Sequence, residues 1–337
     1  MKILSPLDTI DEVEILTQAG AGQFYCSVLE EDWYEKYPVI SINRRPAGKG
    51  HFRKFSDLAE AVKRAHQLDR PVFFALNEHY YINEQYSLLR KYIDGAMHAD
   101  VDALIVSDYG LMAYLRENNY DVPVHVSTGG TVFNWRAMKF YYEEFEVENI
   151  TLPRHLNTDE IRQILTGKPR MDTTVFVLNS RCINVDGFCT FQHGLAGRKI
   201  LPMFRNACML PYNVTVYGNA QDESNRPCIE KAHMLERQKI WEKVHVDDHP
   251  CGACALLEFR DMGITSVKIV GRGNPVKRKV KDVMFLKNLL DCLNEENPSR
   301  NDFRGKARKL YKQTYKRPCR RHMCYFPEVM KNNQSDG

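Results

Sequence analysis

Short runs of β-branched and aromatic residues alternate with segments of helical periodicity along most of the chain. The expected strands span residues 2–4, 23–28, 39–42, 72–76, 103–107, 122–127, 149–152, 174–178 and 266–270. This alternation implies right-handed crossovers and a parallel sheet. About eight such units over roughly 290 residues suit a closed barrel better than an open sheet. We therefore expect an α/β fold, a (β/α) TIM-like barrel, with a doubly wound open sheet as the alternative.

Two capping-box patterns mark expected helix starts. Thr9 is followed three residues later by Glu12, and Asn157 is followed three residues later by Glu160. In this pattern the first side chain accepts a backbone N–H and the second side chain bonds back to the cap residue. We expect a helix to begin at each pair.

The regular alternation stops after Leu178 and resumes before the last strand. The segment 179–254 shows no clean repeat, and it carries six of the ten cysteines. Long irregular segments within compact domains usually bind or catalyse. We predict a barrel domain at residues 1–293 that includes a distorting, cysteine-bearing insertion at 179–254, followed by a basic C-terminal extension at 294–337.

Composition limits the class of protein. The 337 residues carry a net charge of only +4, and no apolar stretch approaches the roughly 18 residues that cross a bilayer. The first residues lack the apolar core of a secretion signal. Ten cysteines without such a signal favour a reducing compartment, where thiols serve as metal or cluster ligands. We therefore predict a cytoplasmic protein without membrane insertion.

Positive charge is concentrated near the C-terminus. Residues 301–325 contain nine Lys and Arg residues against one acid, Asp302, and Tyr311, Tyr315 and Tyr325 lie among them. Basic residues that alternate with aromatic ones are typical of surfaces that track a nucleic-acid backbone and stack on bases. RNA is therefore a candidate partner, and a solvated charged helix is the simpler alternative.

Polar residues follow most of the expected strands. In a parallel barrel the reactive face lies at the carboxyl ends of the strands. The residues that follow a strand in this way are Asn77, Glu78, Ser107, Asp108, Ser127, Thr128, Arg154, Asn179 and Ser180. We expect them to surround one opening of the barrel.

The last strand adds two cations to this face. Lys268 lies between Val267 and Ile269, so the alternation of a strand turns it to the opposite side, into the barrel mouth. Arg272 follows at the strand end. Together with Arg154, these cations predict an anionic ligand.

Several cysteines flank the same face. Cys182 and Cys189 come directly after the expected strand at 174–178, Cys208 follows, and Cys251 and Cys254 precede the last strand. Four thiolates from these loops could converge on one point. Their spacing differs from that of a zinc ribbon or a compact ferredoxin, but it is compatible with an iron–sulfur cluster. Separately buried thiols are the alternative.

Three blocks of sequence resemble a known family. The blocks are residues 123–161, residues 175–189 (VFVLNSRCINVDGFC) and residues 251–273. They are similar to peptidase family U32, the collagenase-like proteases, and the resemblance covers most of residues 1–293. Better-understood members act in oxygen-independent hydroxylation in ubiquinone biosynthesis, or hydroxylate an RNA pyrimidine with prephenate as oxygen source. Those members hold a 4Fe-4S cluster on four cysteines.

The resemblance implies a particular ligand set here. It selects Cys182 and Cys189, which have six residues between them, then Cys208, and Cys251 in preference to Cys254. It also implies an anionic donor such as prephenate, and a related family-member subunit as a partner. The chain departs from the family at SPLDT near its start, at Gly129 and at Asn179, which leaves the substrate open.

The leading hypothesis is therefore oxygen-independent hydroxylation of an RNA base or a quinone-type precursor. Arg154, Lys268 and Arg272 would bind the donor, and His125 would carry a proton because the ordinary pKa of histidine is near neutrality. One alternative is an RNA-binding scaffold subunit with a structural cluster. A cysteine-dependent peptidase is another, whereas the absence of HExxH disfavours a zinc hydrolase. Cys319 and Cys324 are interpreted as surface thiols, or as metal ligands with Cys228 or His322.

Overall fold

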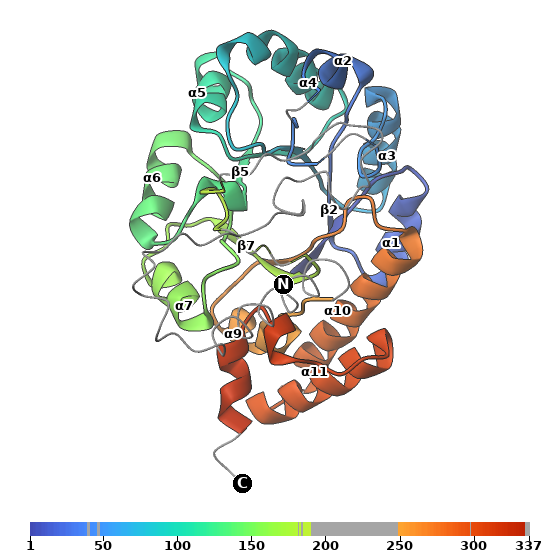
Figure 1. Ribbon diagram of the computed structural model, residues 1–337, viewed down its shortest axis with the longest axis vertical. Coiled ribbons are helices and arrows are strands. Elements are labelled where there is room, and N and C mark those ends of the chain that lie inside the picture. The colour runs from blue at the N-terminus through green and yellow to red at the C-terminus, as the bar shows by residue number, and fades with distance from the viewer. Residues whose placement is uncertain are drawn as a thin grey trace, which may run out of the picture.

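Eight parallel strands close into a barrel in the computed structural model (Figure 1). The structure describes residues 1–38, 41–45, 48–180, 182, 185–189, 249–296 and 298–333. The strands are β1 (Lys2–Pro6), β2 (Gln23–Cys26), β3 (Val72–Leu76), β4 (Ala103–Val106), β5 (Val124–Val126), β6 (Asn149–Thr151), β7 (Asp172–Leu178) and β8 (Ser266–Ile269). Each strand pairs with the next in sequence order, and β8 pairs with β1. The predicted barrel is confirmed, and the alternative of an open sheet is wrong.

One expected strand does not belong to the barrel. Residues 39 and 40 lie outside the described residues, and Ser41 and Ile42 lie in the loop between β2 and β3. The apolar Ile42 is nevertheless buried in the core. Burial of a loop residue thus produced a strand-like pattern in the sequence.

Helices form the outer ring of the barrel (Figure 1). They are α1 (Glu12–Ala19), α2 (Glu31–Lys36), α3 (Phe55–Gln67), α4 (Tyr86–His98), α5 (Tyr109–Glu117), α6 (Trp135–Phe145), α7 (Thr158–Thr166), α9 (Leu256–Asp261), α10 (Val276–Glu296) and α11 (Arg300–Tyr315). Short 3₁₀ turns are η1 (Asn83–Gln85), η2 (Thr128–Gly130), η6 (Ala253–Ala255), η7 (Arg321–Met323) and η8 (Pro327–Asn333). In α3, for example, Leu58, Ala61, Val62 and Ala65 are buried, which follows from their helical spacing. None of the described helices is both long and apolar enough to cross a membrane.

The two predicted capping boxes have different outcomes. The Asn157 side chain accepts from the Glu160 backbone N–H at 2.9 Å, and the Glu160 carboxylate accepts from the Asn157 N–H at 2.8 Å. That capping box is confirmed. The one at Thr9 is wrong, because the Glu12 carboxylate instead accepts from the Asp8 N–H and from the buried ammonium of Lys279, at 2.9 and 2.7 Å.

The barrel interior is apolar on one side and polar on the other. An apolar cluster lines strands β1–β4, formed by Leu4, Tyr25, Phe73, Ala75, Ala103 and Ile105. Across the barrel, Ser266 donates to the Gln23 side chain at 2.8 Å, and Asn149 donates to Thr174 at 3.0 Å. A polar interior can hold a charged side chain such as Lys268, which an entirely apolar core would exclude.

The C-terminal extension is built onto the barrel. Figure 1 shows α10 closing the ring beside α1, with α11 packed outside it. Phe303, Tyr311 and Tyr315 of α11 belong to the same buried cluster as the helices and strands of the barrel. Beyond α11 the chain returns to the end of β7, where Tyr325 donates from its hydroxyl to the carbonyl of Asn179. Residues 323–325 therefore form part of the rim of the barrel at the end of β7.

Candidate active site at the barrel mouth

Lys268 and Arg272 lie inside the mouth, as the sequence predicts. Lys268 is paired with Leu4 and Phe176 in the neighbouring strands, and its side chain is only 5% exposed. Its ammonium lies 4.2 Å from the centre of the Tyr25 ring and 5.6 Å from that of Phe176. Burial first, and then the charges of Arg272 and Arg154, lower the pKa of Lys268 to about 7. Lys268 can therefore change its protonation state near neutral pH.

Arg272 is held by neutral partners. Its guanidinium donates to the Ser27 hydroxyl at 2.8 Å and to the Asn43 carbonyl at 2.9 Å. Burial, followed by the charge of Arg45, lowers its pKa to about 10. Its buried Nε has no partner among the described residues. A site with buried cations that are not neutralised favours an anionic ligand.

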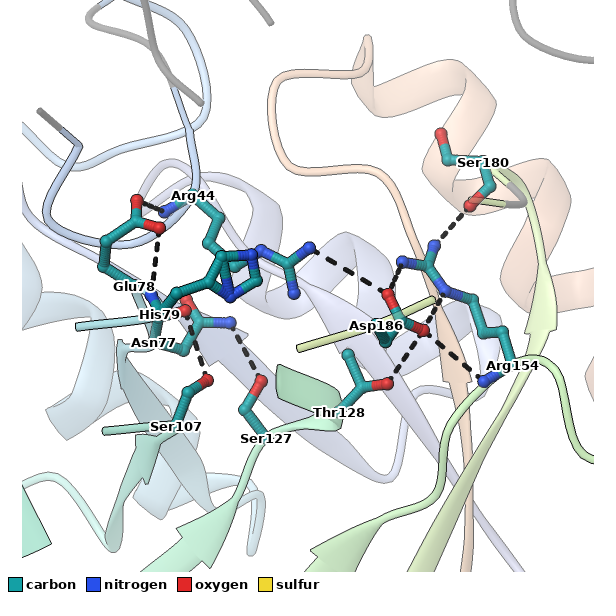
Figure 2. A network of polar contacts seen from close by, with 10 residues as sticks. All are labelled: Arg44, Asn77, Glu78, His79, Ser107, Ser127, Thr128, Arg154, Ser180 and Asp186. Atoms are coloured by element: carbon teal, nitrogen blue, oxygen red, sulfur yellow. Dashed lines mark hydrogen bonds and ion pairs between the residues drawn. The ribbon is translucent and has the colours of Figure 1, made fainter. Parts of the chain in front are cut away.

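Arg154 is paired with a carboxylate of the protein itself. Its guanidinium forms a bidentate ion pair with Asp186, with Nη2–Oδ1 at 2.6 Å and Nε–Oδ2 at 3.0 Å (Figure 2). Thr128 also donates to Asp186, at 2.9 Å. Burial would raise the pKa of this carboxyl, but Arg154 outweighs it and holds the pKa well below the usual value. Much of the Arg154 charge is therefore neutralised within the protein.

This ion pair fixes a piece of the insertion over the mouth. Asp186 is fully buried, and the next residue, Gly187, lies so close to η2 that an added Cβ would be 2.1 Å from a Thr131 methyl. Gly129 in turn leaves no room for a Cβ, which would lie 2.5 Å from the Ser107 hydroxyl. The departure from the family at Gly129 therefore has a local steric reason.

The polar residues that follow β3, β4 and β5 form one network. The Asn77 amide donates to the Ser127 hydroxyl at 3.1 Å, and Ser107 donates to the Asn77 backbone carbonyl at 3.3 Å (Figure 2). The side-chain oxygen of Asn77 is buried without a partner among the described residues. An acceptor of this kind can receive a hydrogen bond from a ligand.

The structure argues against His125 as a proton carrier. Its ring packs against Phe73 at 4.4 Å between centroids, and burial, followed by the charge of Lys268, lowers its pKa to about 3. It also borders a pocket of about 780 Å³ whose other lining residues include Glu148 and Asp172, at the amino ends of β6 and β7. His125 is thus neutral at ordinary pH and accessible from the end of the barrel opposite the mouth.

The predicted iron–sulfur ligands are not brought together in the described residues. Cys182 lies close enough to Arg154 to affect the pKa of that guanidinium, whereas the thiols that affect the pKa of Cys251 are Cys254, Cys324 and Cys319. Within the described ranges, no three Cys, His, Asp or Glu side chains are arranged to hold a metal ion. Cys208 lies outside the described residues. A cluster on Cys182, Cys189, Cys208 and Cys251 therefore stays a prediction.

The tyrosines of the basic extension are not available to stack on bases. Tyr311 and Tyr315 are buried and donate to the His249 carbonyl and the Asp282 carboxylate, at 2.8 and 2.7 Å. Tyr325 is buried as well. The surface that remains for a nucleic acid consists of the exposed basic side chains Lys306, Lys309, Lys312, Lys316, Arg320 and Arg321.

Comparison with known proteins identifies the family. The sequence model of Peptidase family U32 matches residues 8–333. The chain belongs to peptidase family U32. Among U32 relatives, the tRNA hydroxylation protein P of Escherichia coli (strain K12) is 26% identical over 228 residues, 66% of this chain and 46% of that protein. A collagenase of Porphyromonas gingivalis is 27% identical over 163 residues, 48% of this chain and 35% of that protein.

A solved U32 peptidase structure aligns with 52% of this chain and 68% of its own, at 17% identity and a TM-score of 0.38. The U32 chain described here spans about half the length of the curated relatives it matches.

Two features of this U32 site are missing from the sequence-based prediction. Asp186 lies in the irregular insertion, where no periodicity indicates burial, and its partner Arg154 is 32 residues away. Tyr25 occupies a position in β2 that strand alternation turns toward the interior. The sequence therefore contains a signal for its place beneath Lys268.

Proposed function

We propose that this protein acts in the oxygen-independent hydroxylation of a base in tRNA, with an anionic small molecule such as prephenate as oxygen donor. The names of several relatives support the reaction class. The observation that carries the proposal is the pair of buried cations, Lys268 and Arg272, at the barrel mouth. A carboxylate ligand would supply the negative charge that these side chains lack.

The side chains of the mouth suggest how such a donor is held. Arg272 offers a fixed positive charge, and Lys268 becomes charged when a carboxylate approaches, because the anion raises its pKa. Lys268 is therefore the group that can take up or release a proton at the mouth near pH 7. Burial raises the pKa of the neighbouring Tyr25 phenol, so this side chain stays protonated and neutral.

An iron–sulfur cluster remains a separate prediction. The predicted ligands do not gather in the described residues, and the roles given to Lys268 and Arg272 do not involve a cluster. The related subunit likewise remains a prediction, and oligomeric state measured by light scattering at several protein concentrations would test it.

Donor binding can be tested at the mouth by calorimetry with prephenate. We expect binding at pH 8 to take up a proton, so that the measured heat depends on the ionisation enthalpy of the buffer. Replacing Lys268 by Met should remove the proton uptake and weaken binding at least tenfold. The matched control Lys277→Met changes an exposed lysine of α10 and should behave as wild type. Wild-type affinity in the Lys268→Met variant would contradict the assigned role of the mouth.

The substrate class can be tested in cells that lack the gene. Nucleosides from tRNA would be compared by mass spectrometry after supplying wild type, Lys268→Met or Lys277→Met. We expect a hydroxylated base to reappear with wild type and with the control, but not with Lys268→Met. Unchanged tRNA together with a restored quinone would instead assign the protein to a quinone-type precursor.

A further inference from the structure

Four cysteines from two distant parts of the chain lie together where the C-terminal segment meets the end of β7. Cys251 and Cys254 flank the start of η6, and Cys319 and Cys324 flank η7. Cys251 and Cys324 are partners in a parallel β-bridge. The Cys251 N–H donates to the Met323 carbonyl, and the Tyr325 N–H donates to the Cys251 carbonyl, both at 3.0 Å. Direct bridge partners have neighbouring side chains on one face.

The neighbouring thiols act electrostatically on Cys251 and Cys254. Burial first, and then the neighbouring Cys254, Cys324 and Cys319, raise the pKa of Cys251. Burial, followed by Cys324 and Cys319, raises the pKa of Cys254 to about 12. Cys251, Cys254 and Cys324 are all buried, and Cys319 is partly exposed at the edge. A divalent cation between them would reverse this effect and favour the thiolate forms.

The surroundings provide interactions that stabilise thiolates. The Ala253 N–H donates to the Cys251 sulfur at 3.4 Å, and a hydrogen bond of this kind stabilises the charged form of the acceptor. Arg308 and Arg304 act on Cys254 in the direction that lowers its pKa. The spacings are C-x2-C and C-x4-C, both within the range of structural zinc sites with four cysteines.

We propose that Cys251, Cys254, Cys319 and Cys324 bind one Zn²⁺ ion that fastens the C-terminal segment to the barrel. The described side chains do not yet form a group of three at ligand distance, so binding requires the thiols to turn toward one another. The bridge already holds the backbone of Cys251 next to that of Cys324. The proposal does not depend on hydroxylation activity.

Zinc binding would also explain why Cys251 lies with Cys254, Cys324 and Cys319 and not with Cys182, which is near Arg154. A cysteine that binds zinc with Cys254, Cys319 and Cys324 cannot also be the fourth ligand of a cluster on Cys182, Cys189 and Cys208. In the sequence, Cys228 is the one further cysteine of the insertion. Cys208 and Cys228 lie outside the described residues.

Metal analysis of the purified full chain tests the site. The protein would be purified under reducing conditions without added metal and analysed for zinc, iron and sulfide. We expect about one zinc per chain in wild type. Cys254→Ser and Cys319→Ser should each lose it, whereas Cys292→Ser, on α10, should retain it. Because Cys319 is partly exposed, its variant should fold even if Cys254→Ser does not, as circular dichroism would confirm.

Other outcomes would overturn the proposal. Zinc content that is unchanged in both rim variants would place the metal elsewhere. A disulfide between Cys251 and Cys324, found by peptide mapping of protein alkylated at once on lysis, would show a covalent link in place of a metal. Iron and sulfide lost together in the same variants would replace zinc by a cluster at these thiols.

Discussion

At the scale of single residues, the mouth is defined by Lys268, which forms no ion pair with a carboxylate in the described part of the chain. Lys268 is surrounded by the Tyr25 and Phe176 rings and by two arginines. Such a residue costs folding free energy in its charged form. The fold is therefore less stable than it would be without Lys268, but it keeps a side chain that can exchange a proton in a buried site.

The cost of Lys268 should appear in the pH dependence of stability. Below about pH 7 the lysine is charged in both the folded and unfolded states, so its burial penalty is fully present. As pH rises from about 7 toward 10, the folded protein loses the proton while the unfolded chain keeps it, and the free energy of unfolding rises. We expect wild type to gain up to about 4 kcal/mol relative to Lys268→Met over this range, measured by urea unfolding.

The ion pair between Arg154 and Asp186 stabilises the fold, and its contribution also rises with pH, but in the acid range. We expect Asp186→Asn to lower the free energy of unfolding by about 3 kcal/mol at pH 7, because it leaves the buried Arg154 without its counter-ion. The pKa of Asp186 is held low, so the advantage of wild type should be constant above about pH 4 and shrink in stronger acid. If Asp186→Asn and Arg154→Met had additive effects in a double-mutant cycle, the pair would not be coupled.

Predictions for single residues succeeded where alternation alone decides. Lys268 and Arg272 face the mouth because strand geometry fixes their side. His125 also lies in the interior. Alternation does not give its depth along the barrel, so the sequence does not indicate the burial that lowers its pKa. The spacing from Thr9 predicts a capping role for Glu12, whereas its partner in the structure, Lys279, is 267 residues away. Long-range partners of charged residues leave no local pattern.

At the scale of elements, the turn that leads into η6 is shaped by the C-terminal segment. A Cβ on Gly252 would lie 2.7 Å from the Phe326 ring and 3.1 Å from the Tyr325 Cβ. This glycine is needed for close approach, since its φ of −119° is accessible to other residues. The rim therefore depends on contact between residues that are far apart in sequence.

Substitution of this glycine should loosen the rim. We expect Gly252→Ala to lower the free energy of unfolding by about 1–3 kcal/mol and to speed hydrogen exchange in residues 319–326. Gly167→Ala is the control, because nothing lies within 4 Å of the added Cβ. A variant as stable and as protected as wild type would show that Phe326 can move aside without cost.

The elements could be predicted well because their signals are local. Strand composition, helical spacing and the Asn157 box lie within a few residues, and the structure confirms them. The tyrosines of α11 show the limit of such signals. Their spacing among lysines resembles a stacking surface, yet they face the barrel, since helix α11 buries this side against α10 and η6.

At the scale of the whole molecule, the exposed cations of the extension form a basic surface on the outside of the barrel domain. We expect tRNA binding to weaken when Lys309, Lys312 and Lys316 are changed to Gln. The slope of log affinity against log salt should become shallower by about 2–3 if all three contact phosphates.

The control for this experiment has the same net charge. It changes three exposed lysines of the outer ring, Lys54, Lys63 and Lys139, to Gln. Equal losses in both variants would indicate a general effect of charge and no defined RNA surface.

The bridge between Cys251 and Cys324 has a consequence for biosynthesis. The eighth strand ends at Ile269, and Cys324, which forms this bridge at the rim, follows 55 positions later. All eight strands are therefore synthesised before the segment that pairs with Cys251. A chain interrupted after β8 would contain every strand but lack the backbone hydrogen bonds of Cys251 to Met323 and Tyr325.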